Sequence, residues 1–336
     1  MTQADRSPGE RAPYPYHDVI VIGGGPAGYT AMIYLANEHV DALCVEGFES
    51  GGQIAKAAMV RNFPGFPDGV VGAELPQLMR DQAEKLGGAF VFDQVTKIEA
   101  GGDGGYVVHG TMESWRARAV VLATGSSPRR LGLEAESALR NRGVAYCALC
   151  DGPFFSGKRV AVIGGGDAAV EHTMTLTNLG CKVLVVHRRN EFRAARSGQA
   201  FLDQHPDVEI ATPYTVDDIL ASDNGVVAAV RIEHTESGQH RTEPVNAVFV
   251  AIGHEPVNDL AFGLVDVHDD GHVATLAGTS RTSRPGFFAA GDLIDPSYHQ
   301  AVTAAASGCI AAVDASRWLA NQHLLGRSST TRTTSR

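Results

Sequence analysis

The residues best suited to do chemistry are two cysteines, Cys147 and Cys150, followed directly by Asp151. Two thiols at this spacing can close a disulfide reversibly, and their surroundings can lower the pKa of one of them. A carboxyl group beside the second cysteine can donate and accept thiol protons as a general acid and base. Zinc is the alternative use of such a pair, but a zinc site normally takes four ligands. Because the sequence has no second pair at this spacing, we predict redox use and no bound metal.

The other cysteines, Cys44, Cys181 and Cys309, stand in apolar or small-residue surroundings and are predicted to be structural. Five cysteines are too few for the disulfide framework of a secreted protein, so we expect a cytoplasmic protein. The net charge of −10 argues against nucleic acid as a partner. The sequence contains no apolar run of about 18 residues, so no membrane helix is predicted.

A basic cluster forms the second candidate site. Arg188, Arg189 and Arg193 follow His187 at the end of an apolar stretch, 181–186, that reads as a strand. Guanidinium groups donate forked hydrogen bonds that match a phosphate. A basic run is more often a solvated loop, but its position at a strand end favours phosphate binding.

An internal repeat supplies the elements that must position these residues. The segment VIVIGGGPAG at 19–28 matches VAVIGGGDAA at 160–169, and the apolar stretches 40–45 and 181–186 follow at the same offset. A second pair, VVLATG at 120–125 and VFVAIG at 248–253, also matches. Each copy reads as strand, glycine turn, helix and second strand, which is the pattern of a dinucleotide-binding domain. We therefore predict an α/β protein with two Rossmann-like domains.

The two copies differ where the nucleotide's ribose would lie. The glycine turns use Gly23, Gly25 and Gly28 in the first copy and Gly164, Gly166 and Ala169 in the second. Glu46 ends the second strand of the first copy. A carboxylate at this place accepts hydrogen bonds from the ribose hydroxyl groups and repels a 2′-phosphate. His187 and the arginines take the equivalent place in the second copy, which predicts NADPH there. A hydride donor needs an acceptor, so the first copy is predicted to bind FAD.

The order of the repeats indicates that one domain is inserted into the other. We predict a discontinuous FAD domain at 17–126 and 255–325, and an NADPH domain carrying the cysteines at 127–254. Pro128 and Pro256 suit the two crossing points, because proline stiffens a linker. Residues 1–16 and the polar tail 326–336 are expected to be disordered.

The last chemistry-bearing segment begins at Asp292, whose carboxylate follows a strand end and can bind a flavin hydroxyl. Residues 300–312 lack charge and are rich in alanine, glycine and serine. Such a helix packs closely on its neighbours, and its positive N-terminal end can stabilise negative charge on a reduced flavin.

From Asp18 to Leu319 the chain resembles the bacterial low-molecular-weight thioredoxin reductases. The matching segments, in order, are GGGPAGYTA, GGQI, NFPGF, ATGSSPR, CALCDG, VIGGGDAAVE, HRRNEFRA, AIGHEP, FFAAGD and QAVTAAASGC. Their combination is far more specific than any one of them. The resemblance implies a homodimer that reduces thioredoxin, a three-layer ββα form for both domains, and domain rotation during the reaction.

The resemblance also implies a role for individual residues. Cys150 would lie nearer the flavin, Cys147 would attack the partner's disulfide, and Asp151 would exchange protons. The residues implied to bind FAD are Gly23, Gly25, Ala27, Gly28, Glu46, Gln53, Asn62, Ala123, Gly125, Asp292, Gln300 and Ala301. Those implied to bind NADPH are Gly164, Gly166, Asp167, Ala168, His187, Arg188, Arg189, Arg193 and Gly253.

Three residues depart from the family pattern: His299 stands where arginine is common, Leu149 where threonine is common, and Ala306 where glycine is common. None removes a reacting atom. An FAD-dependent dithiol oxidase, which closes a disulfide in a small natural product and passes electrons to oxygen, remains an alternative. A redox sensor without turnover is a further one. Neither alternative explains an intact NADPH segment together with an intact dithiol as well as a reductase does.

Overall fold

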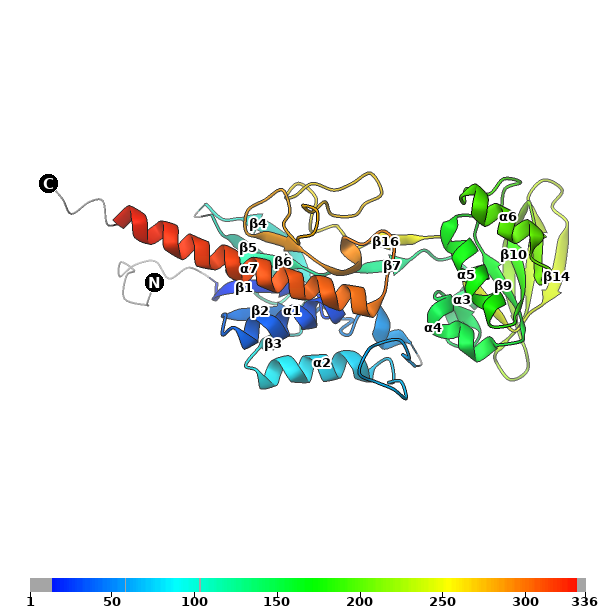
Figure 1. Ribbon diagram of the computed structural model, residues 1–336, viewed down its shortest axis with the longest axis horizontal. Helices are drawn as coiled ribbons and strands as arrows, with labels where there is room; N and C mark the ends of the chain where they lie inside the picture. Colours follow the sequence, from blue (N-terminus) through cyan, green and yellow to red (C-terminus); the bar gives the residue numbers. More distant parts are fainter. Residues whose placement is uncertain (1–13, 58, 103, 331–336) are drawn as a thin grey trace. The chain divides into compact units, whose positions relative to one another are not determined.

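The computed structural model describes residues 14–57, 59–102 and 104–330 (Figure 1). The chain forms two compact units. The first comprises the chain up to Lys56, Phe63–Ser126 and the chain from Pro256 onward. The second comprises Ala57–Asn62 and Ser127–Glu255. Asn62, which the resemblance assigns to FAD, is thus grouped by its contacts with the second unit.

The first unit is built on a seven-stranded sheet. Six of its strands follow the order β3-β2-β1-β6-β5-β4, and the seventh, β17, pairs with β6. Its parallel part comprises β1 (Tyr16–Ile22), β2 (Ala42–Val45), β3 (Ala89–Val91), β6 (Ser114–Leu122) and β17 (Phe287–Ala289). Its antiparallel part comprises β4 (Val95–Ala100) and β5 (Tyr106–Gly110), which join it through β6.

Helices α1 (Pro26–Asn37) and α7 (Ala301–Thr330) pack together on one face of this sheet, and α2 (Glu74–Lys85) packs beside α1 (Figure 1). Alternate residues of β1 serve the two faces, as the two-residue period of a strand requires. Val19 and Val21 pack in the core beneath these helices, whereas Ile20 and Ile22 pack in the core on the opposite face. A short helix η1 (Gln53–Lys56) precedes α2.

The second unit has a parallel five-stranded sheet with the order β11-β10-β9-β15-β8. Its strands are β8 (Val144–Ala145), β9 (Arg159–Ile163), β10 (Lys182–Val186), β11 (Val208–Ala211) and β15 (Ala247–Val250). Its helical segments are α3 (Glu134–Ala138), α4 (Ala148–Asp151), η2 (Gly152–Phe155), α5 (Asp167–Asn178) and α6 (Arg196–Gln204).

An antiparallel three-stranded sheet forms the third layer of this unit. It consists of β12 (Tyr214–Ala221), β13 (Val227–His234) and β14 (His240–Pro244). One core lies between the two sheets and includes Ile163 and Val230, and the other lies between the parallel sheet and α5 and includes Val162 and Leu176. The predicted α/β class with dinucleotide-binding domains is confirmed.

The chain passes between the units at a two-stranded ribbon. β7 (Ser126–Pro128) pairs with β16 (His254–Pro256). Both prolines noted in the sequence end these strands, and Arg129 N donates to Gly253 O at 2.9 Å. In the first unit a short helix, η3 (Gly291–Leu293), follows β17 directly.

At both ends of the chain the described structure reaches into the segments that were expected to be disordered. Tyr16 begins β1, and Arg116 N donates to Pro15 O at 2.8 Å, so the expected extension reaches too far. At the other end α7 continues to Thr330, well past the predicted helix at 300–312 and into the expected tail. No proline interrupts the sequence after Pro296, and the two glycines of α7, Gly308 and Gly326, each cost a helix only about 1 kcal/mol. Residues 1–13 and 331–336 lie outside the described part of the chain.

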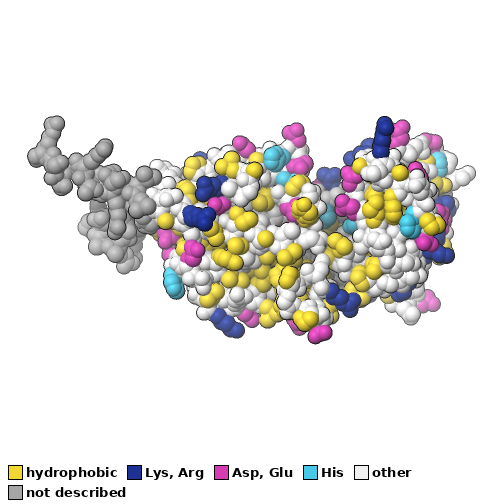
Figure 2. Space-filling model, in the orientation of Figure 1, with side chains coloured by type: hydrophobic (Ala, Val, Ile, Leu, Met, Phe, Trp, Pro, Cys, Tyr) yellow, Lys and Arg dark blue, Asp and Glu magenta, His cyan; other side chains and the backbone are white. Residues whose placement is uncertain are grey.

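Two surface properties follow from the described residues. No helix among them is both long and apolar enough to cross a membrane. Figure 2 shows apolar side chains gathered over the face that carries α1, α2 and α7. Exposed apolar residues of these three helices include Tyr34, Leu78 and Ile310, which are 42%, 48% and 42% exposed.

Candidate functional site

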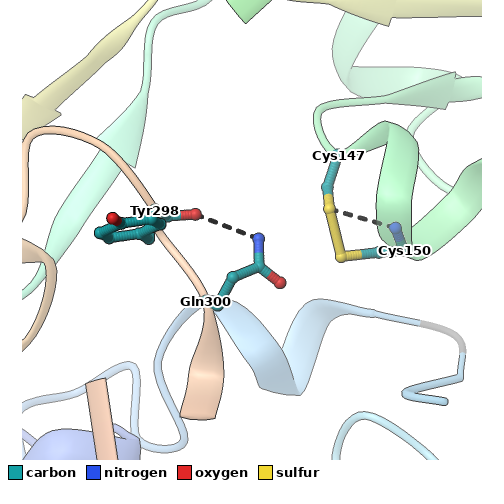
Figure 3. The surroundings of a disulfide bond; sticks show 4 residues. All are labelled: Cys147, Cys150, Tyr298 and Gln300. Carbon is teal, nitrogen blue, oxygen red and sulfur yellow. Dashed lines mark hydrogen bonds between the residues drawn. A yellow bond between two sulfur atoms is a disulfide. The ribbon is translucent and has the colours of Figure 1, made fainter. Parts of the chain in front are cut away.

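The two cysteines of the predicted dithiol are joined as a disulfide, with their Cα atoms 5.3 Å apart. Cys147 immediately precedes the single turn α4, and its Sγ accepts a hydrogen bond of 3.2 Å from Cys150 N (Figure 3). Between them Ala148 is fully buried, whereas Leu149 is 59% exposed. The turn brings both sulfur atoms together, as a reversible disulfide requires.

Asp151, the residue after the disulfide, lies in surroundings that favour its protonated form. Burial raises the pKa of Asp151 to about 6, and the positive charge of Arg140 opposes that rise. A carboxyl group with this pKa exchanges protons near neutral pH, as a general acid or base must.

A buried carboxylate supports the segment that leads into the disulfide. Tyr146 donates its hydroxyl to Glu136 Oε1 at 2.8 Å, and the guanidinium of Arg140 lies 5.2 Å from the Tyr146 ring centre. Glu136 also accepts from the backbone N–H groups of Leu131 and Gly132. Sequence reasoning missed Glu136 and Arg140, because nothing in the spacing of either residue marks it as a partner of the dithiol.

The two glycine turns repeat each other in three dimensions. Gly25 and Gly166 precede α1 and α5 with φ of −104° and −106°, and both have ψ of −175°. A Cβ on Gly23 would lie 2.3 Å from Ala123 O, and one on Gly164 would lie 2.3 Å from Ala251 O. Each turn therefore needs glycine to pass the end of a neighbouring strand. These two strand ends are the second repeat detected in the sequence.

The turns leave open space where a pyrophosphate is expected. A Cβ on Gly166 would meet nothing within 4 Å, and one on Gly25 would meet only Gly52 Cα at 3.9 Å. Gly125 also has free space around it and, like Gly253, a left-handed backbone, with φ of 72° and 103°. Side chains do not fill these positions, so the backbone N–H groups at the start of α1 and α5 can receive an anion.

Glu46 lies at the end of β2, is 7% exposed, and is held on one side. Tyr29 donates its hydroxyl to Glu46 Oε1 at 2.7 Å, and Arg80 Nε donates to the same oxygen at 2.9 Å. Burial and the bond to Glu46 raise the pKa of Tyr29, which keeps this donor protonated. No described residue donates to Oε2 of Glu46, so one oxygen remains to accept ribose hydroxyls. Arg80 stands 34 residues away in sequence, and no motif predicts it.

His187 occupies the equivalent place in the second unit but faces the protein. Its ring is 7% exposed and stacks on Phe192 with 5.2 Å between ring centres. Nε2 lies 3.1 Å from Glu191 O, and a Cβ on Gly165 would lie 2.3 Å from the ring. Burial lowers the pKa of His187 and the neighbouring arginines add to this effect, so the ring supports the glycine turn as a neutral group.

The three arginines after β10 are exposed, and none of the ion pairs among the described residues involves them. The backbone turns back to the glycine loop here, because Arg193 N donates to Gly165 O at 2.7 Å. Asp167, the first residue of α5, accepts from Ala195 N at 2.8 Å, while Ala168 is exposed. The basic cluster therefore lies beside the second glycine turn with its guanidinium groups available for a phosphate.

The remaining predicted flavin residues lie after β17 and at the start of α7. Ser126 Oγ lies 3.4 Å from Asp292 Oδ2; burial raises the pKa of Asp292, and His299 opposes the rise. Gln300 Nε2 donates to Tyr298 O at 3.1 Å (Figure 3), and Ala301 is the first residue of α7. Gln53 begins η1 in the same unit.

The small residues of α7 explain how it lies so close to α1. A Cβ on Gly308 would lie 2.1 Å from Ala27 O, and Ser307 Oγ accepts from Gly291 N at 2.7 Å. The predicted close packing of this segment is therefore present, with Ala27 on the partner helix. Ser307 and Ser126 escaped notice in the sequence because serine is common in loops and helices alike.

Comparison with known proteins gives a consistent result. A pyridine nucleotide-disulphide oxidoreductase family model matches residues 17–308. A thioredoxin reductase of Mycolicibacterium smegmatis is 42% identical over 91% of this chain and 97% of its own length. A bifunctional thioredoxin reductase/thioredoxin of Mycobacterium leprae is 44% identical over 90% of this chain, which spans 66% of that longer protein. The structure of thioredoxin reductase from Giardia duodenalis superposes with a TM-score of 0.84 at 34% identity, covering 91% of this chain and 99% of that one. The chain belongs to the pyridine nucleotide-disulphide oxidoreductase family and, within it, to the thioredoxin reductases.

Proposed function

We propose that this protein binds FAD and NADPH and reduces the disulfide of a thioredoxin or a thioredoxin-like protein. The single observation that carries the proposal is the Cys147–Cys150 disulfide with the raised pKa of Asp151 beside it. When bound, the nicotinamide and the flavin supply the two electrons that reduce this disulfide.

The residues around each glycine turn fit the two cofactors. Gly25 and Gly166 leave space that a Cβ would fill, which suits a pyrophosphate at the start of α1 and of α5. In the first unit Glu46 offers a free oxygen to a ribose and would repel a 2′-phosphate. In the second unit Arg188, Arg189 and Arg193 offer donors to a 2′-phosphate. We therefore assign FAD to the first unit and NADPH to the second.

The sulfur chemistry then proceeds on the chain's own residues. Two electrons and two protons convert the Cys147–Cys150 disulfide into two thiols. The Cys147 thiolate attacks the partner's disulfide, forms a mixed disulfide and releases one partner thiolate. The Cys150 thiolate attacks Cys147 Sγ, which restores the internal disulfide and releases the second partner thiolate. Asp151 holds a proton for a departing thiolate, because about half of its carboxyl groups are protonated at about pH 6.

The assembly and location of the enzyme are part of the same proposal. We propose a homodimer in the cytoplasm, where a dithiol is kept in turnover rather than as a permanent cross-link. The exposed apolar side chains of Tyr34, Leu78 and Ile310 support a covered face on α1, α2 and α7.

An anaerobic titration tests the proposal as a whole. NADPH is added to the flavin-loaded protein, then NADH to a second sample, and flavin absorbance is followed before a thioredoxin is added. We expect NADPH to bleach the flavin at far lower concentration than NADH, and thioredoxin to restore the colour. Rapid oxygen consumption with small dithiols and no bleaching by NADPH would instead establish the dithiol oxidase alternative.

Replacing Asp151 by asparagine is expected to lower kcat for thioredoxin reduction about a hundredfold or more, because the group that supplies the thiol proton is lost. An acid with a pKa of about 6 loses its proton as pH rises through that value, so kcat of the unchanged enzyme should decline above pH 6. The variant's kcat should be flat across that window. Stopped-flow measurement from pH 5 to 9 checks both points.

The control for Asp151→Asn is Asp223→Asn, which changes an exposed carboxylate in the β12–β13 turn of the same unit. It should keep both the rate and the pH profile. Because folding raises the pKa of Asp151 above its ordinary value of 3.8, ionising this group costs stability as pH rises through about 6. The asparagine variant should therefore be at least as stable as the unchanged protein at pH 8. A pH profile that keeps its limb in Asp151→Asn would assign the proton transfer to another group.

Replacing Glu46 by glutamine is expected to weaken FAD binding about tenfold or more. The amide oxygen can still accept from Tyr29 and Arg80, so the NH₂ group would take the place of Oε2 and could not accept a ribose hydroxyl. Flavin fluorescence during titration with apoprotein measures the affinity. The matched control is Glu38→Gln at the C-terminal end of α1, away from the glycine turn, and this variant should bind FAD normally. Equal affinity in the two variants would remove Glu46 from the FAD site.

A further inference from the structure

A hollow of about 270 Å³ lies in the first unit between the loop before β17 and the later turns of α7. Arg284, Pro285 and Gly286 line it from the loop, and Trp318 and Asn321 line it from the helix. This is the N-terminal end of β17, whereas nucleotides bind at the carboxyl ends of parallel strands. β17 runs parallel to β6 and leads away from the hollow to Asp292. The hollow is therefore separate from the nucleotide site of its unit.

The indole of Trp318 forms part of the apolar lining of the hollow. Gly286 has φ of 77°, and a Cβ there would lie 3.0 Å from two carbon atoms of the Trp318 ring. Glycine thus allows the indole to lie directly against the backbone. Leu276 extends the apolar lining at the rim and is 61% exposed. A flat apolar body would cover surfaces that now face water.

Among the described residues that line the hollow, the charged ones are Arg281 and Arg284, and none is a carboxylate. Arg281 Nε lies 3.4 Å from Asp314 Oδ1, and Arg284 Nη1 donates to Leu264 O at 3.3 Å. Each contact uses one nitrogen of a guanidinium group that carries five N–H donors.

Asp314 does not compete for the space in the hollow. It is 6% exposed, and its Oδ2 accepts from Ser280 N at 3.0 Å and from Ser280 Oγ at 2.9 Å. Asp314 pairs with Nε of Arg281, so the remaining N–H groups of Arg281 and Arg284 can donate to an anion.

We propose that this hollow binds a small planar aromatic carboxylate, with its ring against Trp318 and its carboxylate between Arg281 and Arg284. An inorganic anion would leave the apolar wall exposed to water, and a positively charged aromatic ligand would bring a like charge to the two arginines. The volume of about 270 Å³ lies just below the usual range of about 300–1,000 Å³ for ligand sites, which favours a ligand with a single ring. This site does not depend on the proposed redox function.

The test uses the flavin-loaded protein and two matched probes, trans-cinnamate and its neutral amide, measured by isothermal titration calorimetry. Saturable binding of cinnamate is expected, with the amide at least about tenfold weaker because it cannot receive the charge-assisted bonds. The Arg281→Gln/Arg284→Gln double variant should lose at least about tenfold in cinnamate affinity. Arg317→Gln, an exposed arginine of α7 that does not line the hollow, should bind as the unchanged protein does.

The proposal is overturned if cinnamate shows no saturable binding at millimolar concentration. It is also overturned if acid and amide bind equally, or if the double variant keeps full affinity. The flavin spectrum and the melting temperature report whether each variant is folded. Because Arg284 also bonds to the backbone, Arg281→Gln alone decides the question if the double variant fails to fold.

Discussion

Replacing Cys150 by serine is expected to stop thioredoxin reduction while leaving reduction of the flavin by NADPH intact. A serine cannot form a disulfide with Cys147, so electrons have no route from the flavin to a protein substrate. The rate of NADPH-dependent thioredoxin reduction should fall on the order of a thousandfold or more, to the background of the assay. Anaerobic stopped-flow spectroscopy measures flavin bleaching, and an insulin-coupled assay measures turnover.

Cys147→Ser separates the roles of the two thiols. It should also abolish turnover, but it leaves Cys150 as the thiol that the resemblance places nearer the flavin, so only this variant should show a thiolate-to-flavin absorbance band. The matched control is Cys309→Ser, which removes a free thiol of the other unit and should keep full turnover. Full electron transfer to a protein disulfide in Cys150→Ser would contradict the assigned chemistry and would revive a role for the dithiol in sensing.

Replacing Arg188 and Arg189 together by alanine is expected to raise KM for NADPH about a hundredfold while leaving KM for NADH nearly unchanged. A hydrogen bond to a charged group contributes about 1.5–3 kcal/mol, so the loss of two such donors to a 2′-phosphate is large. NADH has no such phosphate and loses nothing. Steady-state kinetics with both nucleotides at fixed ionic strength measure the ratio, because added salt weakens the interaction by screening.

Lys182→Ala is the control for the arginine variants. It removes an exposed cation from the opposite end of β10, so it changes the net charge of the unit without touching the predicted phosphate site. It should leave the preference for NADPH intact. If the double alanine variant raised KM for NADPH and for NADH equally, the arginines would stabilise the conformation of the loop and would not bind the 2′-phosphate.

Much of the fold could be predicted from the sequence, because each strand–turn–helix unit is a local pattern. Apolar runs of four residues, a glycine turn and an apolar helix specify β1, α1 and β2 without distant information. The same pattern at 160–186 predicts β9, α5 and β10. The pair Cys147 and Cys150 was recognisable for the same reason, since three residues of separation let a single turn bring the sulfurs together.

The contacts between distant segments could not be predicted, because no local pattern encodes them. Tyr29 and Arg80 both bond to Oε1 of Glu46 from different helices, and only the packing of α1 and α2 beside β2 brings them there. Similarly, the raised pKa of Asp151 results from burial, which its neighbours in sequence do not reveal. The extent of α7 could not be predicted, because the polar composition after residue 325 by itself favours disorder, whereas the backbone is helical to Thr330.

The amino-acid sequence by itself determined the two nucleotide-binding units, the dithiol and the basic strand end, since each depends on residues that are close along the chain. The tertiary structure decided which oxygen of Glu46 is free, that His187 turns inward while the three arginines stay exposed, and that Trp318 meets Arg281 and Arg284 at one hollow. The reason is physical: burial and electrostatic environment depend on every element packed around a side chain. A chain brings those elements together only when it folds.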